Sequence, residues 1–239
     1  MISNYKYALK YVRLVADWFG KYMNYDFTSE VNMRFLVAII QEIIYLKKNN
    51  TIIKLLLLTG IRSGECLGLR WDSIDFNNKT LFIDKTLSYA DNEWYLSTPK
   101  TLRSTRTISL DDNAIALLLK HREEQNKQKE IVGAAWQHPE LVFTSCTGHW
   151  YDRSRLNTQF RRFIAKHKEE LKLEHNITIH GLRHTNAALL LYAGEDIENI
   201  SAHLGHASSD ITSRVYAHMY AEVKVRLAKT VSNALFNNK

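Results

Sequence analysis

Histidine and arginine gather in one short stretch of the chain, His180-Gly-Leu-Arg-His-Thr185, and His206 and Tyr216 follow further on. His180 and Arg183 are three residues apart, so at the start of a helix they lie on one face. The N-terminus of a helix also attracts anions, because its free N–H groups and its dipole present positive charge. The stretch therefore predicts a site for an anion such as phosphate, unless a metal or chance explains the spacing.

A zinc site is the first alternative, because His180 and His184 have the i, i+4 spacing of two ligands on a helix. Gly181, however, stands where the zinc motif H-E-x-x-H has glutamate, and no cysteine or carboxylate cluster in the sequence completes a ligand shell. A structural role in the core is the alternative for His203 and His218. We expect neither a metal nor another cofactor.

Two further clusters carry positive charge. In the first, TGIRSGECLGLRWDSIDF, Arg62 lies in a turn between two predicted helices, and Glu65 follows three residues later. An ordinary surface ion pair is the alternative interpretation. In the second, STPKTLRSTRTISL, Lys100, Arg103 and Arg106 lie on a predicted hairpin. They predict contact with a backbone phosphate, although cations are also common at sheet edges.

The three clusters together supply two arginines, a lysine, two histidines and a tyrosine. Such a set suits an oxyanion, because the guanidinium group binds phosphate oxygens as a rigid fork. A tyrosine can act as a nucleophile and form a covalent ester. The sequence offers neither the carboxylates of a two-metal nuclease nor a nucleotide-binding glycine loop. The combination therefore favours phosphoryl chemistry without a metal.

The elements that must position these residues are mostly helical. The chain has only 9 glycines and 2 prolines in 239 residues, which favours helices over a turn-rich β fold. Three short segments, 79–89, 93–100 and 105–110, alternate Thr, Ile, Phe and Tyr with polar residues and predict strands. The predicted fold class is α+β, predominantly α-helical with a small three-stranded antiparallel sheet. The predicted helices span 5–23, 30–47, 50–58, 112–130, 154–172, 182–193, 196–204, 210–219 and 221–235.

Composition sets broad limits on function. Lys plus Arg number 32 against 25 for Asp plus Glu, and this excess fits a nucleic-acid partner without proving one. Cys66 and Cys146 form no disulfide framework, which indicates a reducing, cytoplasmic setting. No segment approaches the roughly 18 apolar residues that span a membrane, so we expect no membrane partner.

Four motifs together resemble those of the tyrosine recombinase (phage integrase) family, over about residues 30–220. They are TGIRSGECLGLRW, TPKTLRSTRTISL, HGLRHTNAALLL and HLGHASSDITSRVYAH, in the family's order and spacing. The resemblance implies the catalytic domain of a site-specific DNA recombinase, such as the integrase of a phage or mobile element.

Carried over residue by residue, the resemblance assigns the catalytic roles. The implied catalytic residues are Arg62, Lys100, His180, Arg183, His206 and Tyr216, with Glu65 as a supporting acid. Tyr220 is a rival nucleophile, but it lacks the surrounding motif of Tyr216. Basic side chains are further candidates for DNA contact: Arg103, Arg106, Arg153, Arg155, Arg161 and Arg162.

The implied chemistry is covalent strand transfer. Tyr216 attacks a DNA phosphate, and Arg62, Arg183 and His206 hold its non-bridging oxygens as charge builds there. Lys100 protonates the departing 5′ oxygen, and His180 assists proton removal from the tyrosine. The product is a 3′-phosphotyrosine with a free 5′-hydroxyl, so neither metal nor ATP is required. Relaxation of supercoiled DNA, as in type IB topoisomerases, is an expected side activity.

The resemblance also implies domains and partners. We expect residues 1–28 to be a remnant helix of a core-binding domain or a linker, and residues 29–239 to be the catalytic domain with a C-terminal helix. A truncated or unusually short member would bind DNA weakly and with strong salt dependence. The expected partner is a double-stranded DNA recombination site, bound by a homotetramer that is monomeric in solution. An apolar stripe in the tail either packs on its own domain or docks on a neighbouring protomer: Val223, Leu227, Val231 and Leu235.

Two other interpretations stay open from the sequence. A helix-turn-helix DNA-binding regulator without catalysis fits residues 196–218, which scan as two helices around Gly205. That interpretation explains the basic charge but leaves Arg62, Lys100 and His180 without a role. A catalytically inactive relative is disfavoured, because no residue of the expected set is missing.

Overall fold

The computed structural model describes residues 51–99, 102–168, 178–193 and 195–206. Several predictions fall outside these residues, including Lys100, Tyr216 and Tyr220, the boundary near residue 28 and the apolar stripe of the tail. The helices predicted at 5–23, 30–47, 210–219 and 221–235 lie outside as well.

Helices make up most of the described chain, as predicted. They are α3 (Thr51–Thr59), α4 (Ser63–Leu67), α5 (Asp112–Val132), α6 (Arg153–Lys168), α7 (Ile179–Ala193) and α8 (Ile197–Leu204). Short 3-10 turns occur at Trp71–Ser73, Leu102–Ser104 and Gly133–Ala135. Helix α7 starts three residues earlier than the sequence predicts, so it already includes His180. This extension places the whole His-x-x-Arg pair in the first turns of one helix.

Local signals in the sequence explain where several helices begin and end. The Asp111 carboxylate accepts from the Ala114 N–H, and the Asp196 carboxylate accepts from the Asn199 N–H, so each caps a helix N-terminus. Gly205 follows α8 in the left-handed conformation, with φ of 68°, and ends that helix. The end of α8 at Gly205 therefore determines where the next residue, His206, lies.

The strands form two antiparallel sheets instead of one. Strands β1 (Ile74–Asp75), β2 (Thr80–Ile83) and β5 (Arg106–Ser109) make a three-stranded sheet in the order β1-β2-β5. Strands β3 (Thr86–Ala90) and β4 (Glu93–Ser97) form a separate hairpin.

The antiparallel pairing is confirmed, but the strand predicted at 79–89 is divided between the two sheets. Leu81 and Ile83 of β2 point into the core, and strict alternation would bring the charged Lys85 inward next. The chain therefore leaves the first sheet there and starts β3. The hairpin turns at Asp91 and Asn92, which both have positive φ, as a tight two-residue turn requires.

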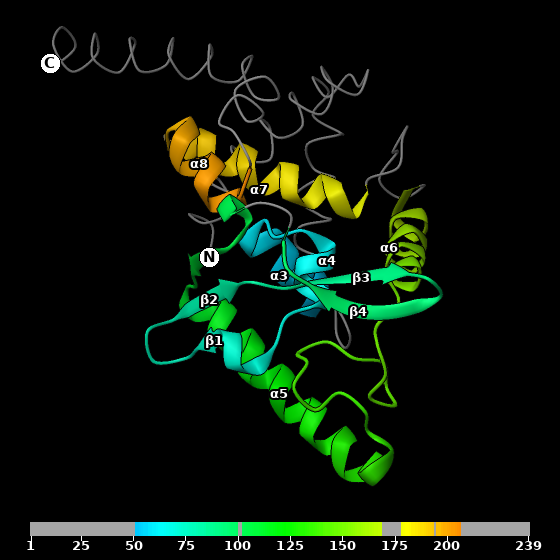
Figure 1. Ribbon diagram of the computed structural model, residues 1–239. Helices are drawn as coiled ribbons and strands as arrows, with labels where there is room; N and C mark the ends of the chain where they lie inside the picture. Colours follow the sequence, from blue (N-terminus) through cyan, green and yellow to red (C-terminus); the bar gives the residue numbers. More distant parts are fainter. Residues whose placement is uncertain (1–50, 100–101, 169–177, 194, 207–239) are drawn as a thin grey trace, which may run out of the picture.

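Figure 1 shows α3 and α4 at the centre of the labelled elements, with α7 and α8 on one side and α5 on the opposite side. Helix α3 contacts both α5 and α7, while α8 contacts α7 and β5. The core is continuous around these contacts and includes Leu55, Leu56, Ile108 and Phe160. This packing brings the start of α4, the start of α7 and the end of α8 together. Every helix among the described residues is too short or too polar to cross a bilayer.

Candidate active site

The turn between α3 and α4 is pressed against α7 and α8 at Gly60. Gly60 has φ of 64°, and a Cβ added there would lie 2.5 Å from Asn186 Oδ1 and 2.8 Å from Leu204 Cδ2. Only glycine fits both the conformation and the close approach. The turn therefore carries the next residues, including Arg62, directly to the ends of two helices that are distant in sequence.

Arg62 links this turn to the end of α8. Its Nη2 donates to the Gly205 carbonyl at 3.0 Å, and its Nη1 donates to Glu65 Oε1 at 2.7 Å. Glu65 Oε2 also accepts from the Arg62 backbone N–H at 2.9 Å. The side chain of Arg62 is 39% exposed, whereas that of Glu65 is 4% exposed, so the pair is not an ordinary surface ion pair. One part of the guanidinium stays open to a ligand.

Arg183 approaches the same place from α7. It is 3% exposed; its Nη1 donates to the Gly60 carbonyl at 2.8 Å and its Nη2 to the Leu204 carbonyl at 2.7 Å. Arg183 and Arg62 thus hold consecutive carbonyls, of Leu204 and Gly205. The two arginines that the sequence places far apart converge in the structure.

The histidines around these arginines are kept neutral. Burial lowers the pKa of His206 to about 4, with the positive charges of Arg183 and Arg62 adding to the effect. Burial, followed by the same two guanidinium groups, also lowers the pKa of His180. The rings of His180 and His184 lie edge to face, 4.7 Å apart, and burial lowers the pKa of His184 to about 4. At neutral pH each imidazole can therefore accept a proton.

Arg62, Arg183 and His180 line a pocket of about 710 Å³, whereas His184 and His206 are not among its lining residues. Helix α6 supplies its second wall, and the Arg153 guanidinium lies against the start of α4, since a Cβ added at Gly64 would be 2.9 Å from Arg153 Nη2. Among the described residues, its lining has four arginines and no carboxylate, so it presents a positive field suited to a polyanion. The lining residues are Ile61, Arg62, Ser63, Arg153, Ser154, Asn157, Thr158, Phe160, Arg161, Thr178, Ile179, His180 and Arg183. We call this the cationic pocket.

The arginines predicted to contact DNA separate into groups. Arg153 and Arg161 line the cationic pocket, while Arg162 on α6 and Arg103 beside β5 are exposed elsewhere. Arg155 lines a different, smaller pocket of about 120 Å³, which shares no lining residue with the cationic pocket.

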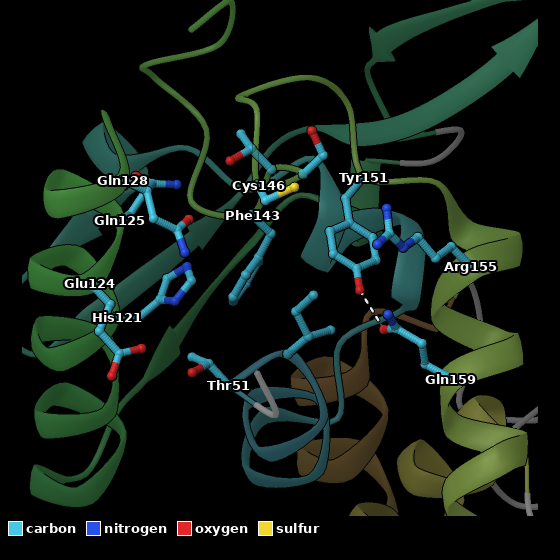
Figure 2. A pocket seen from close by; sticks show the side chains of 13 residues that line it. Thr51, His121, Glu124, Gln125, Gln128, Phe143, Cys146, Tyr151, Arg155 and Gln159 are labelled. Carbon is cyan, nitrogen blue, oxygen red and sulfur yellow. Dashed lines mark hydrogen bonds between the residues drawn. The ribbon is translucent and has the colours of Figure 1, made fainter. Parts of the chain in front are cut away.

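Figure 2 shows this second pocket, between α5 and α6. The Tyr151 hydroxyl donates to Gln159 Oε1 at 2.6 Å, and Arg155 lies beside that tyrosine. Across the pocket, His121 Nε2 bonds the Val142 carbonyl at 2.7 Å. We call this the neutral pocket, because Glu124 accompanies Arg155 in its described lining.

Arg106 departs from the sequence interpretation. It was predicted to contact DNA from a hairpin, but its side chain is 7% exposed and its guanidinium is bound to Glu65 inside the protein. Because it also donates to the carbonyls of His203 and Ser104, a DNA phosphate cannot take the place of these partners without disrupting the site. The buried and bonded guanidinium of Arg106 therefore does not support the predicted DNA contact.

Asn186 belongs to the framework of the site, although it is not among the residues predicted from the sequence. Its Nδ2 donates to the carbonyls of Leu57 and Leu58 at 3.0 and 3.1 Å, which ties α7 to the end of α3. The only sequence signal is its place three residues after Arg183, on the same face of the helix.

Among the described residues there is no group of three or more side chains suited to hold a metal ion.

Comparison with known proteins places this chain in a family. The model of the phage integrase family matches residues 28–222. The chain is 30% identical over 178 residues to the ICEBs1 integrase of Bacillus subtilis, covering 74% of this chain and 47% of the relative. It is 28% identical over 187 residues to a XerC-like tyrosine recombinase of Caldanaerobacter subterraneus, covering 73% and 46%.

A solved structure of the Tn1549 transposon integrase, in complex with transposon right end DNA, has the same fold. The TM-score is 0.67 at 21% identity, over 80% of this chain and 64% of that one. The chain spans about half the length of the curated relatives it matches. Because the family model covers most of the sequence, the chain belongs to the phage integrase family.

Proposed function

We propose that this protein is a site-specific DNA recombinase of a phage or mobile element, which cuts and rejoins DNA through a 3′-phosphotyrosine. The observation that carries the proposal is the convergence of Arg62 and Arg183 on consecutive carbonyls beside one cationic pocket. The names of the matched relatives, an integrase and a tyrosine recombinase, support the same reaction.

In this proposal the two arginines and His206 bind the scissile phosphate. The contacts of Arg62 to Glu65 and Gly205 use two of the five N–H groups of an arginine, which leaves donors directed at a ligand. Donors that are fixed before the substrate arrives stabilise negative charge in the transition state without reorganisation. Neutral His206 adds a hydrogen bond without adding a further charge.

The covalent step uses Tyr216 and Lys100, which the sequence motifs assign. The Tyr216 oxygen forms a bond to phosphorus, and the bond from phosphorus to the 5′ oxygen breaks. Neutral His180 accepts the tyrosine proton, and Lys100 gives a proton to the 5′ oxygen. The 5′-hydroxyl of a second strand reverses the same step, which completes strand exchange.

In this proposal, further basic side chains bind the DNA backbone on either side of the scissile phosphate. Arg153 and Arg161 on α6 line the pocket beside the catalytic groups and suit the phosphates next to the scissile one. Arg103 and Arg162 are exposed and suit more distant phosphates. We assign residues 29–239 to a catalytic domain, which the family match over 28–222 supports. We further propose that the protein acts in the cytoplasm as a homotetramer bound to double-stranded DNA.

The regulator interpretation is not favoured. A helix-turn-helix protein needs an exposed recognition helix, but it has no need for two arginines, a buried glutamate and neutral histidines around one pocket. The relatives named as integrases and recombinases also favour strand transfer.

A covalent trapping experiment tests the proposal. The full chain is incubated with a pool of nicked, 5′-labelled duplexes of random sequence, so that a cleaved short strand diffuses away and the adduct accumulates. We expect a labelled protein–DNA species that survives denaturation, that Tyr216→Phe abolishes and that Tyr220→Phe retains. DNA binding without any adduct would contradict the proposal and favour a regulator.

A further inference from the structure

Arg106 is buried, and the proposed function does not explain why an arginine is buried at this position. Arg106 begins β5 and directs its guanidinium away from solvent, toward Glu65 and the end of α8. Its Nη2 donates to Glu65 Oε2 at 3.0 Å, while the contact from Nη1 to Oε1 is 3.4 Å. An arginine bound to both oxygens of a carboxylate fixes the plane of that carboxylate.

Glu65 passes this constraint on to Arg62. The same Oε1 that faces Arg106 accepts from Arg62 Nη1, and the same Oε2 accepts from the Arg62 backbone N–H. Burial alone would raise the pKa of Glu65, but the Arg106 charge and its hydrogen bonds keep that pKa below its usual value. One ionised carboxylate thus orients two arginines, of which only Arg62 reaches the pocket.

Arg106 also holds the end of α8. Its Nε donates to the His203 carbonyl at 2.7 Å. Gly205 lies close against the guanidinium, since a Cβ added there would be 2.7 Å from Arg106 Nη1. Because Arg62 binds the Gly205 carbonyl, the backbone just before His206 lies between two guanidinium groups.

From these contacts we propose that Arg106 is a positioning residue of the recombinase site. It sets Arg62 through Glu65 and sets His206 through the end of α8, without touching DNA. This inference rests on the proposed function for its catalytic consequence, while the positioning itself concerns only the folded protein.

Lysine and glutamine at position 106 separate charge from geometry. Arg106→Lys keeps the charge, but a single ammonium group cannot bind Glu65 at both oxygens and the His203 carbonyl at once. Arg106→Gln removes the charge as well. Both variants keep every residue that lines the cationic pocket, so a loss of activity cannot come from the removal of a lining side chain.

The first measurement is single-turnover adduct formation at saturating DNA. We expect the rate to fall about a hundredfold in Arg106→Gln, as a misplacement near 1 Å produces, and less in Arg106→Lys. DNA affinity and its salt dependence should stay at wild-type values. Arg161→Gln should show the reverse, with weaker binding and a salt slope smaller by about 1. Lys127→Gln, exposed on α5, is the neutral control.

The second measurement does not need activity. NMR titration follows the His206 ring and the Gly205 amide in the full chain. Four groups face His206 and lower its pKa together with burial: Arg183, Arg62, His184 and Arg106. Arg106→Gln should raise that pKa and shift the Gly205 amide signal, whereas Arg106→Lys should shift the amide and leave the pKa nearly unchanged.

The outcomes separate the two proposals. A wild-type cleavage rate in a folded Arg106 variant, or weaker binding with a smaller salt slope, overturns the positioning role. If Arg106→Gln does not fold, Arg106→Lys decides by the same criteria. If the wild-type chain forms no adduct with any DNA but the Gly205 amide shifts in both variants, the recombinase proposal fails and the positioning role stands. No adduct and no shift overturns both.

Discussion

The cationic pocket and the neutral pocket lie on two sides of the same helix. Helix α6 directs Arg153 and Arg161 into the first and Arg155 into the second. In the part of the chain that the structure describes, no carboxylate lines the first pocket. In the second, a glutamate accompanies the arginine, and the tyrosine and histidine already bind protein partners.

The comparison shows that basic residues close in sequence need not share a role. Arg153 and Arg155 are two positions apart in the chain, and at about 100° per residue they point to nearly opposite sides of the helix. The orientation of each residue on the helix, and the charge of what lies opposite it, decide which arginine can receive DNA. The predictions below test whether the two pockets differ in function as they differ in charge.

The largest difference is expected in the rate of cleavage. Arg183→Lys keeps a positive charge but loses one of the two carbonyl contacts, so adduct formation at saturating DNA should fall about 10²–10³-fold. His121→Gln changes the neutral pocket and should cleave at the wild-type rate, since glutamine can still donate to the Val142 carbonyl. Equal losses in both variants would contradict the distinction.

A smaller difference is expected in DNA affinity. Arg161→Gln should lower the slope of log affinity against log salt by about 1, since one phosphate contact is lost. Arg155→Gln, on the other side of α6, should leave the slope unchanged. Filter binding between about 50 and 200 mM salt measures both. If Arg155→Gln shows the larger loss, DNA crosses the neutral pocket instead.

The histidines should also respond differently to an anion and to pH. The pKa of His206 is about 4, lowered by burial and then by cations, so inorganic phosphate bound in the cationic pocket should raise it. Burial also lowers the pKa of His121, but Glu124 opposes this and the only arginine lining its pocket is Arg155, so phosphate should change it little. NMR titration of both rings with and without phosphate makes the comparison. Equal shifts at the two rings would contradict it.

The sign of the effect on stability follows from the same pKa values. Because the folded pKa of His206 lies below its ordinary value of 6.5, the folded state binds fewer protons than the unfolded state below that pH. The contribution of His206 to stability is therefore complete above pH 6.5 and is lost as pH falls toward 4. His206→Gln should make the free energy of unfolding, measured with urea, depend less on pH between 6.5 and 4. An unchanged pH dependence would contradict the low pKa of His206.

The smallest effect is expected from Tyr151→Phe. This change removes the hydrogen bond to Gln159 in the neutral pocket and should cost about 1 kcal/mol of unfolding free energy. Cleavage and DNA affinity should stay unchanged, which thermal unfolding and the trapping assay can check together. A loss of cleavage would assign the neutral pocket a part in the reaction.

Much of the site could be predicted from the sequence because its motifs have fixed local spacing. His180 and Arg183 share a helix face, and the glycine before Arg62 marks the turn that delivers it. The capping residues Asp111 and Asp196 could be recognised in the same way. Each of these features depends on residues within one turn or one helix.

The role of Arg106 could not be predicted, since its partners are distant in the sequence. Glu65 lies 41 residues away, and the Gly205 carbonyl that Arg62 binds is 143 residues from Arg62. The residues on either side of Arg106, Thr105 and Thr107, are exposed, which gives the segment the pattern of a surface hairpin. The division of the strands between two sheets depends likewise on tertiary packing.

The shared carboxylate of Glu65 has an evolutionary consequence. Because one buried negative charge serves two guanidinium groups, a change at position 65 leaves the buried Arg106 without its carboxylate, and a change at position 106 leaves the buried Glu65 paired with Arg62 but without its buried arginine. Single substitutions at either position are therefore expected to be selected against even when the DNA target changes. We expect the two positions to covary among integrases, so that the specificity of these enzymes diverges on the outer surface while this ion pair is inherited as a unit.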